Sequence, residues 1–191
     1  MIRPVQFACA TLLALIVMAG QPVKADVTIA AHRAVYDLSL KRATDRSGVS
    51  SVSGRMVIEL TGNRCEGWAV TFRMVNQYLL QRGMTRLSDN RSSSWESGDG
   101  LHLHYTQRQF VDSKLQTEGR VKVDRSNPTG PGKGEMTKPN EEAFEIAPGV
   151  VFPVQHQIRL VEAALAGESR ERSVVYDGSE GAKAYVAVSF I

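Results

Sequence analysis

The sequence predicts a mainly β protein, in which an antiparallel sheet of consecutive strands carries one packed α-helix. Two observations support this fold class. Most of the chain consists of segments with alternating apolar and polar residues, rich in β-branched and aromatic side chains and separated by Gly, Asp, Asn and Ser turns. This pattern is typical of consecutive antiparallel strands. One later segment instead spaces its apolar residues by three and four, as an amphipathic helix does.

Alternation predicts eight strands. In the first, Ala34, Tyr36 and Leu38 share a face, because successive side chains of a strand point to opposite sides. The segment Ser97 to Gly100 predicts a tight hairpin, since glycine tolerates the positive φ of such turns. The fourth strand is strongly polar and is expected to be an edge strand or to have its outer face in water. The predicted strands are His32 to Lys41, Ser53 to Leu60, Trp68 to Gln77, Thr85 to Glu96, Leu101 to Val111, Leu115 to Asp124, Ser173 to Asp177 and Ala184 to Phe190.

The single helix is predicted over Val154 to Ala166, where the apolar residues form one stripe. Pro153 suits the first turn of a helix and Gly167 suits its end. Such a helix packs across a curved sheet or plugs one. Between the sixth strand and this helix, the loop Arg125 to Asn140 is rich in Gly and Pro, which predicts no continuous strand or helix there.

The N-terminus has the features of an export signal. Arg3 precedes a mostly apolar run from Val5 to Gly20, and the small residues Val23 and Ala25 suit a cleavage site. We therefore expect residues 1–25 to be a cleaved signal peptide and residues 26–191 to form a single domain. The alternative is a membrane anchor, but the run is shorter than the roughly 20 residues that a spanning helix needs. The mature chain is therefore expected outside the cytoplasm and not spanning the membrane.

The charge of the mature chain is small. Removal of Arg3 and Lys24 with the signal lowers the formal net charge from +3 to +1. A balance this close to neutral gives no electrostatic reason to expect nucleic-acid binding.

Few residues indicate chemistry. His102 and His104 share a strand face and could hold a divalent metal, but no third ligand is evident nearby, so a polar sheet face is the favoured interpretation. Glu96 and Asp99 could form an acid and base pair, although they lie where solvated turns usually carry charge. No G-x-S-x-G nucleophile motif is present. We expect no catalytic residues, no metal and no cofactor, and therefore a protein that is not an enzyme.

Cys65 is the one cysteine left after removal of the signal, which contains Cys9. It lies in the turn-like string TGNRCEGW, between two predicted strands. One thiol cannot form a disulfide within its own chain. No histidine lies close in sequence, so Cys65 is a poor candidate for a nucleophile.

Several ordered blocks run from about residue 30 to about residue 180, namely HRAVYDLSL from His32, SGRMVIELTGNRCEGW from Ser53, LSDNRSSSWESGDG from Leu87, GVVFPVQH from Gly149 and VVYDGS from Val174. Together they are much more specific than any one of them. In this order they resemble the EipB family of exported alphaproteobacterial proteins.

This resemblance implies a periplasmic protein folded as a β-spiral, an incompletely closed barrel of antiparallel strands with a helix against it. It also implies a role in cell-envelope and outer-membrane integrity under stress, without established catalytic residues. As a partner it implies a periplasmic tetratricopeptide-repeat protein.

The resemblance also gives Cys65 a role. It matches the first of two cysteines that the family joins in a disulfide, and the partner cysteine is absent from this chain. The family continues past the VVYDGS block with further strands, whereas this sequence stops at Ile191. We therefore expect the domain to lack its C-terminal strands.

Two functions remain open. The first is a non-enzymatic envelope factor that binds other periplasmic proteins through sheet edges or loops. The second is a carrier that holds a lipid or a lipoprotein acyl chain inside the spiral. A continuous apolar cavity lined by residues such as Phe72, Met74 and Leu103 would favour the carrier, and an interior filled by side chains would favour the first function. A hydrolase would need a cleft with converging titratable groups, and the sequence predicts none.

Overall fold

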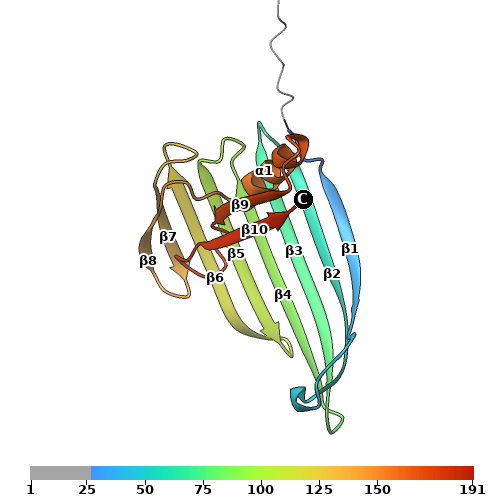
Figure 1. The fold of residues 1–191 in the computed structure, drawn as a ribbon. Coiled ribbons are helices and arrows are strands. Elements are labelled where there is room, and N and C mark those ends of the chain that lie inside the picture. Colours follow the sequence, from blue (N-terminus) through green and yellow to red (C-terminus); the bar gives the residue numbers. More distant parts are fainter. Residues whose placement is uncertain (1–26) are drawn as a thin grey trace, which may run out of the picture.

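The computed structural model describes residues 27–191, so the predicted signal peptide lies outside the described residues. They form an eight-stranded sheet, a two-stranded sheet and an α-helix (Figure 1). In the large sheet every strand is antiparallel to its neighbour in sequence, in the order β1 to β8. The elements are β1 (His32–Ser39), the 3-10 turn η1 (Asp45–Ser47), β2 (Val49–Asn63), β3 (Gly67–Leu80), β4 (Thr85–Glu96), β5 (His102–Val111), β6 (Lys114–Arg125), β7 (Gly132–Lys138), β8 (Glu142–Ile146), α1 (Pro153–Leu165), β9 (Arg170–Val175) and β10 (Tyr185–Phe190).

The mainly β class, the antiparallel order and the single helix are confirmed. The Ser97 to Gly100 hairpin is confirmed too, because the Gly100 N–H donates to the Ser97 carbonyl at 2.9 Å and Gly100 has a φ of +71°. The polar strand β4 is not an edge strand, since it pairs with both β3 and β5. Its outer face does lie in water, where Arg91 and Ser93 are exposed.

The prediction of a loop from Arg125 to Asn140 is wrong, because β7 occupies part of it and pairs with both β6 and β8. The glycines of β7 do not form turns. They allow a side chain of the neighbouring strand to pack against the backbone. A Cβ on Gly134 would lie 2.1 Å from the ring of Phe144 on β8, so this strand position has no room for a side chain.

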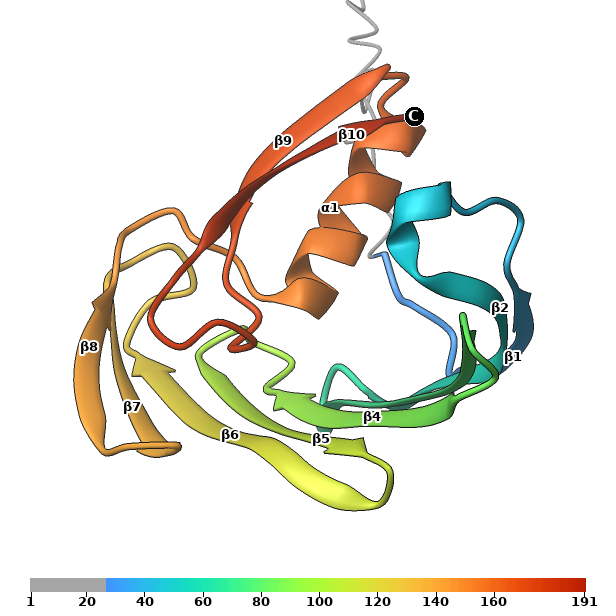
Figure 2. The ribbon, with the colours of Figure 1, turned by 90° about the horizontal axis from the view of Figure 1, so that it is seen from below.

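The large sheet is strongly curved, and its edge strands β1 and β8 do not pair with each other. Figure 2 shows α1 in the opening between the two ends of the curved sheet, with the β9–β10 hairpin beside it. The segment before the helix is joined to β9 by a parallel bridge between Val151 and Val175. The sheet is therefore not closed into a barrel, and the helix occupies its opening.

The core lies in the half of the sheet that faces this helix. Strand register places Trp68, Glu96, Leu103 and Val123 in one row across β3 to β6, and all four are buried. The larger apolar cluster comprises Leu103, Val121, Val123, Ile146, Val150, Phe152 and Tyr176, and the smaller one comprises Leu60, Trp68 and Val154. Within residues 27–191, α1 is too short to cross a bilayer.

Candidate functional site

Cys65, the one site residue that the sequence singles out, lies in the short turn between β2 and β3. Its thiol is exposed and free in the described part of the chain. The turn is held by Asn63, whose Oδ1 accepts the N–H groups of Cys65 at 2.8 Å and of Glu66 at 3.1 Å. The predicted disulfide role of Cys65 therefore stays a prediction, at a position that a second cysteine could reach from solvent.

The two histidines that share a face of β5 bind protein groups. His102 Nδ1 lies 2.5 Å from a carboxylate oxygen of Asp124 on β6, and the ring of His104 packs against Trp95 with 5.5 Å between centroids. Within residues 27–191 no three His, Cys, Asp or Glu side chains gather as metal ligands would. The pair forms part of a polar sheet face.

The interior of the sheet is not one continuous apolar cavity. Leu103 is fully buried in the larger apolar cluster. Phe72 and Met74 instead line a separate cavity of about 250 Å³ farther from the helix. That cavity is also lined by polar and charged side chains, namely Asn90, Arg91, Ser92, Tyr105, Gln107, Arg108 and Gln109. The three residues proposed as a lipid-binding lining are thus divided between a filled core and a small cavity of mixed character.

Glu96 is the most unusual carboxyl group of the described chain. The expectation that it is solvated in a turn is wrong, because its side chain is fully buried at the end of β4. Both of its carboxylate oxygens accept the N–H of Val154, at 2.9 and 3.0 Å. The helix has no side-chain cap of its own at Phe152, so Glu96 caps its first turn from the sheet.

Burial raises the pKa of Glu96 to about 7. Hydrogen bonds from the N–H groups of Val154 and Gln155 and the charge of Arg125 lower it, but they do not offset desolvation. Glu96 therefore titrates near neutral pH while holding the start of α1. No substrate-sized cleft surrounds it, so we assign it a structural role.

Arg125, at the end of β6, is buried as well. Its Nε donates to the Gly100 carbonyl and its Nη1 to the Val150 carbonyl, both at 2.7 Å, and the guanidinium lies 4.2 Å from the centroid of the Phe152 ring. Burial lowers its pKa, and the charge of Arg159 acts in the same direction. Arg125 thus ties the β4–β5 hairpin to the segment that leads into α1.

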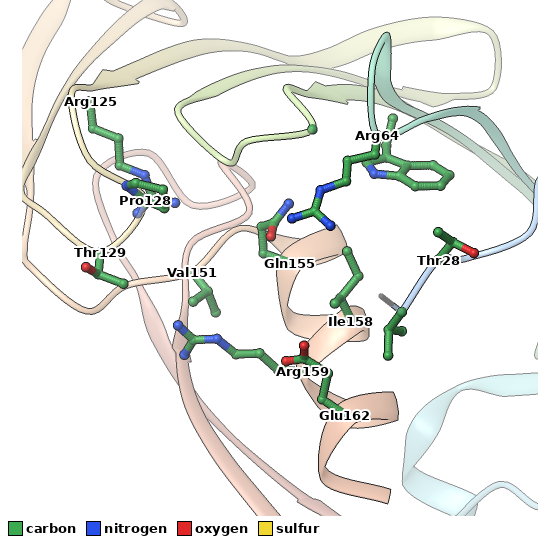
Figure 3. A pocket seen from close by; sticks show the side chains of 13 residues that line it. Thr28, Arg64, Arg125, Pro128, Thr129, Val151, Gln155, Ile158, Arg159 and Glu162 are labelled. Carbon is green, nitrogen blue, oxygen red and sulfur yellow. The ribbon is translucent and has the colours of Figure 1, made fainter. Parts of the chain in front are cut away.

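Figure 3 shows a pocket of about 170 Å³ beside this buried arginine. Its lining comes from α1, from the β2–β3 turn that carries Cys65, and from the loop after β6. Neither this pocket nor the roles of Glu96 and Arg125 follow from the sequence, because the contributing residues lie far apart in the chain. One local signal does point to the role of Glu96. The helix begins at Phe152–Pro153, where neither residue can cap it with its own side chain, so a cap from elsewhere is needed.

The edges of both sheets carry exposed apolar residues. On the edge strand β1, Val35 is 53% and Tyr36 is 48% exposed. On β10, which in the described chain pairs only with β9, Val186, Val188 and Phe190 are exposed on one face. An unpaired strand with apolar side chains is a ready surface for another chain to add to.

A curved, incompletely closed antiparallel sheet with a helix in its opening defines a β-barrel-like class of protein. The sequence model of the EipB-like family matches residues 23–191. The chain therefore belongs to the EipB-like family.

Two similar proteins come from Brucella abortus. The cell envelope integrity protein EipB of strain 2308 is 33% identical over 165 residues, which are 86% of this chain and 58% of that protein. A crystal structure of a beta-barrel-like protein of the domain of unknown function DUF1849 matches with a TM-score of 0.74 and 33% identity, and the match covers 83% of this chain and 65% of that one. The chain thus spans less than two thirds of the length of these relatives.

Proposed function

We propose that this protein is a non-enzymatic periplasmic factor that maintains the integrity of the cell envelope, including the outer membrane, through contacts with other proteins. Its membership of the EipB-like family and its similarity to a protein named for cell-envelope integrity support the biological role. A tetratricopeptide-repeat protein of the periplasm is the proposed partner.

The filled interior is the observation that carries the mode of action. Leu103, Val123, Phe152 and Tyr176 are each fully buried in the larger apolar cluster, so side chains occupy this part of the interior, which a lipid carrier would leave open. The exposed edge strand β1 offers unpaired backbone groups flanked by Val35 and Tyr36. Binding by strand addition needs these features and no cavity.

The alternative is a carrier of a lipid or a lipoprotein acyl chain. It is favoured by the half-buried side chains of Met56, Phe72 and Met74 on the inner face, away from the helix. The cavity there, at about 250 Å³, is smaller than the roughly 300 to 1,000 Å³ of most ligand pockets, and its lining is largely polar. We therefore place this function second.

Site-specific crosslinking in living cells tests the choice. A photoreactive side chain at Val35 on β1 should capture the tetratricopeptide-repeat protein, identified by mass spectrometry. The same side chain at Lys114, an exposed residue at the far end of the β5–β6 hairpin, is the matched control and should capture none. A protein that shows no capture at Val35 and keeps a bound lipid after gentle purification would be a carrier.

A further inference from the structure

The pocket of Figure 3 is rich in positive charge. Arg64 reaches it from the β2–β3 turn, Arg125 from the end of β6 and Arg159 from α1. Among the described residues that line it, Glu162 is the one acidic residue, so these residues together carry a formal charge of +2. The arginines thus approach one small space from three separate elements.

Two of these arginines have no acidic partner in direct contact. Arg125 donates hydrogen bonds from Nε and Nη1 to backbone carbonyls, so its Nη2 can donate to a further acceptor. Arg159 makes no salt bridge to any residue between 27 and 191. Burial lowers the pKa of Arg125, and the charge of Arg159 lowers it further, so the two guanidinium groups lie close enough to repel each other. Two neighbouring guanidinium groups that no carboxylate contacts directly favour an external anion.

Two further donors in the lining lack an acceptor. Trp68 is only 3% exposed, and its Nε1–H makes no hydrogen bond. The buried Nε2 of Gln155, on the first turns of α1, is also without a partner. Because a buried donor is costly when unpaired, an acceptor is expected at such a place.

We propose that this pocket binds a phosphate group, held by Arg125 and Arg159, with Arg64 at its edge. A phosphate carries a charge of about −1.5 to −2 and accepts hydrogen bonds in several directions, which suits guanidinium groups that converge from different elements. A volume of about 170 Å³ suits such a group and excludes an acyl chain. This site goes beyond the proposed function and does not depend on it.

The outer face of the sheet holds a competing group of four arginines around one pocket, and three of them are already paired. Asp89 accepts hydrogen bonds from Arg73 and Arg91, and Glu118 accepts one from Arg108. These carboxylates neutralise much of the positive charge, so phosphate should prefer the pocket. Arg108 therefore provides a matched control.

The two tryptophans make the test direct. Trp68 lines the pocket, whereas Trp95 lies on the outer face, where its Nε1 donates to the Glu66 carbonyl at 3.3 Å. Titration of inorganic phosphate into the ¹⁵N-labelled protein, purified from the periplasm of the expressing cells, should shift the Trp68 indole N–H signal saturably and leave that of Trp95 nearly unchanged. Absence of a saturable Trp68 shift would overturn the proposal.

Substitutions then assign the shift to the pocket. Arg159→Gln removes one charge from a partly exposed helix residue and should weaken phosphate binding about tenfold. Arg108→Gln removes the same charge from the outer face and should leave the affinity unchanged. If Arg159→Gln has no effect, or if Arg108→Gln has the larger one, the pocket is not the binding site. Glu162→Gln should strengthen binding, because it removes the one negative charge among the described lining residues.

Two further experiments distinguish the possible sources of the phosphate group. Flotation with phosphatidylcholine vesicles, with and without phosphatidic acid, tests a lipid headgroup, and calorimetry with glycerol 3-phosphate tests a soluble phosphomonoester. Vesicle binding that needs phosphatidic acid and is lost in Arg159→Gln assigns the site to a lipid headgroup. Binding of the soluble ester alone assigns it to a small metabolite.

Discussion

The inner face of the sheet has two unlike halves. The row nearest α1 comprises Trp68, Glu96, Leu103 and Val123, all of them buried. Farther along the same strands, the row of Tyr36, Met56, Met74 and Asn90 is at most half-buried, because no helix covers it in the described chain. The difference teaches that apolar burial, and hence most of the stability, is concentrated at the end of the sheet near α1, while the apolar side chains farther along remain at most half-buried.

A pair of identical substitutions breaks this comparison most directly. Phe152→Ala removes a fully buried ring from the core and should lower the free energy of unfolding by about 3 to 5 kcal/mol. Phe72→Ala removes a half-buried ring from the uncovered half and should cost less than about 2 kcal/mol. Urea denaturation of both variants measures the two values. Equal losses would show that the halves contribute alike.

Glu96 sharpens the comparison through pH, because it is a fully buried carboxyl group of the helix-facing half. Its pKa is raised to about 7 from an ordinary value of 4.5, so the folded protein binds this proton more tightly than the unfolded chain does. Stability from this group is therefore greatest below about pH 4.5 and falls as the pH rises to about 7. The fall has a ceiling of about 3 kcal/mol.

The Glu96→Gln variant isolates that effect. It keeps an oxygen that can accept the N–H of Val154 but cannot ionise, so the fall in stability between pH 5 and pH 8 should be absent. Urea midpoints of wild type and variant across this range give the difference. Glu59→Gln, at an exposed position on β2, should keep the wild-type pH dependence. A Glu96→Gln variant with that dependence would show that another group causes it.

The sequence predicts these regions unequally. The strand from Thr85 to Glu96 is recovered in full, because segments that contain glycine bound it on both sides, at Gly83 and at Gly98 to Gly100. Strand β7 is missed because glycines in a sequence suggest a loop. Gly134 is instead required because the ring of Phe144 on β8 leaves no room for a side chain, and this contact is known only once the strands are paired. The helix-facing pocket is missed for the same kind of reason, since it depends on which distant arginines the curvature of the sheet brings together.

The outer face adds a third region, in which ion pairs and not apolar packing fill the surface. Asp89 accepts hydrogen bonds from Arg91 and Arg73, and these hold its pKa at about 2. Because this pKa lies below the ordinary value of 3.8, the stabilisation is present above about pH 4 and is lost as the pH falls through about 2. Asp89→Asn should therefore cost about 1 to 2 kcal/mol at pH 7 and much less at pH 2.

The isolated pair on β1 and β2 is the control for that network. Asp37 and Arg55 form a salt bridge at 2.8 Å, but both side chains are largely exposed. Asp37→Asn should cost less than about 0.5 kcal/mol, because water screens an exposed pair. Thermal melts of both variants at pH 7 compare the two. If Asp37→Asn lowered stability as much as Asp89→Asn does, the ion-pair network of the outer face would add no stability beyond that of an isolated pair.

Cys65 should give the smallest effect, although the family resemblance assigns it half of a disulfide. A disulfide stabilises by restricting the unfolded chain, by about 2 to 5 kcal/mol when it is native to a small secreted domain. In the described chain Cys65 is exposed and free in a turn that Asn63 holds, so its thiol closes no loop. Cys65→Ser should therefore change the free energy of unfolding of the monomer by less than about 0.5 kcal/mol, with and without reductant. A larger loss that appears only under oxidising conditions would mean that Cys65 forms a disulfide. The β2–β3 turn would then be the point where another segment or another protein is covalently attached.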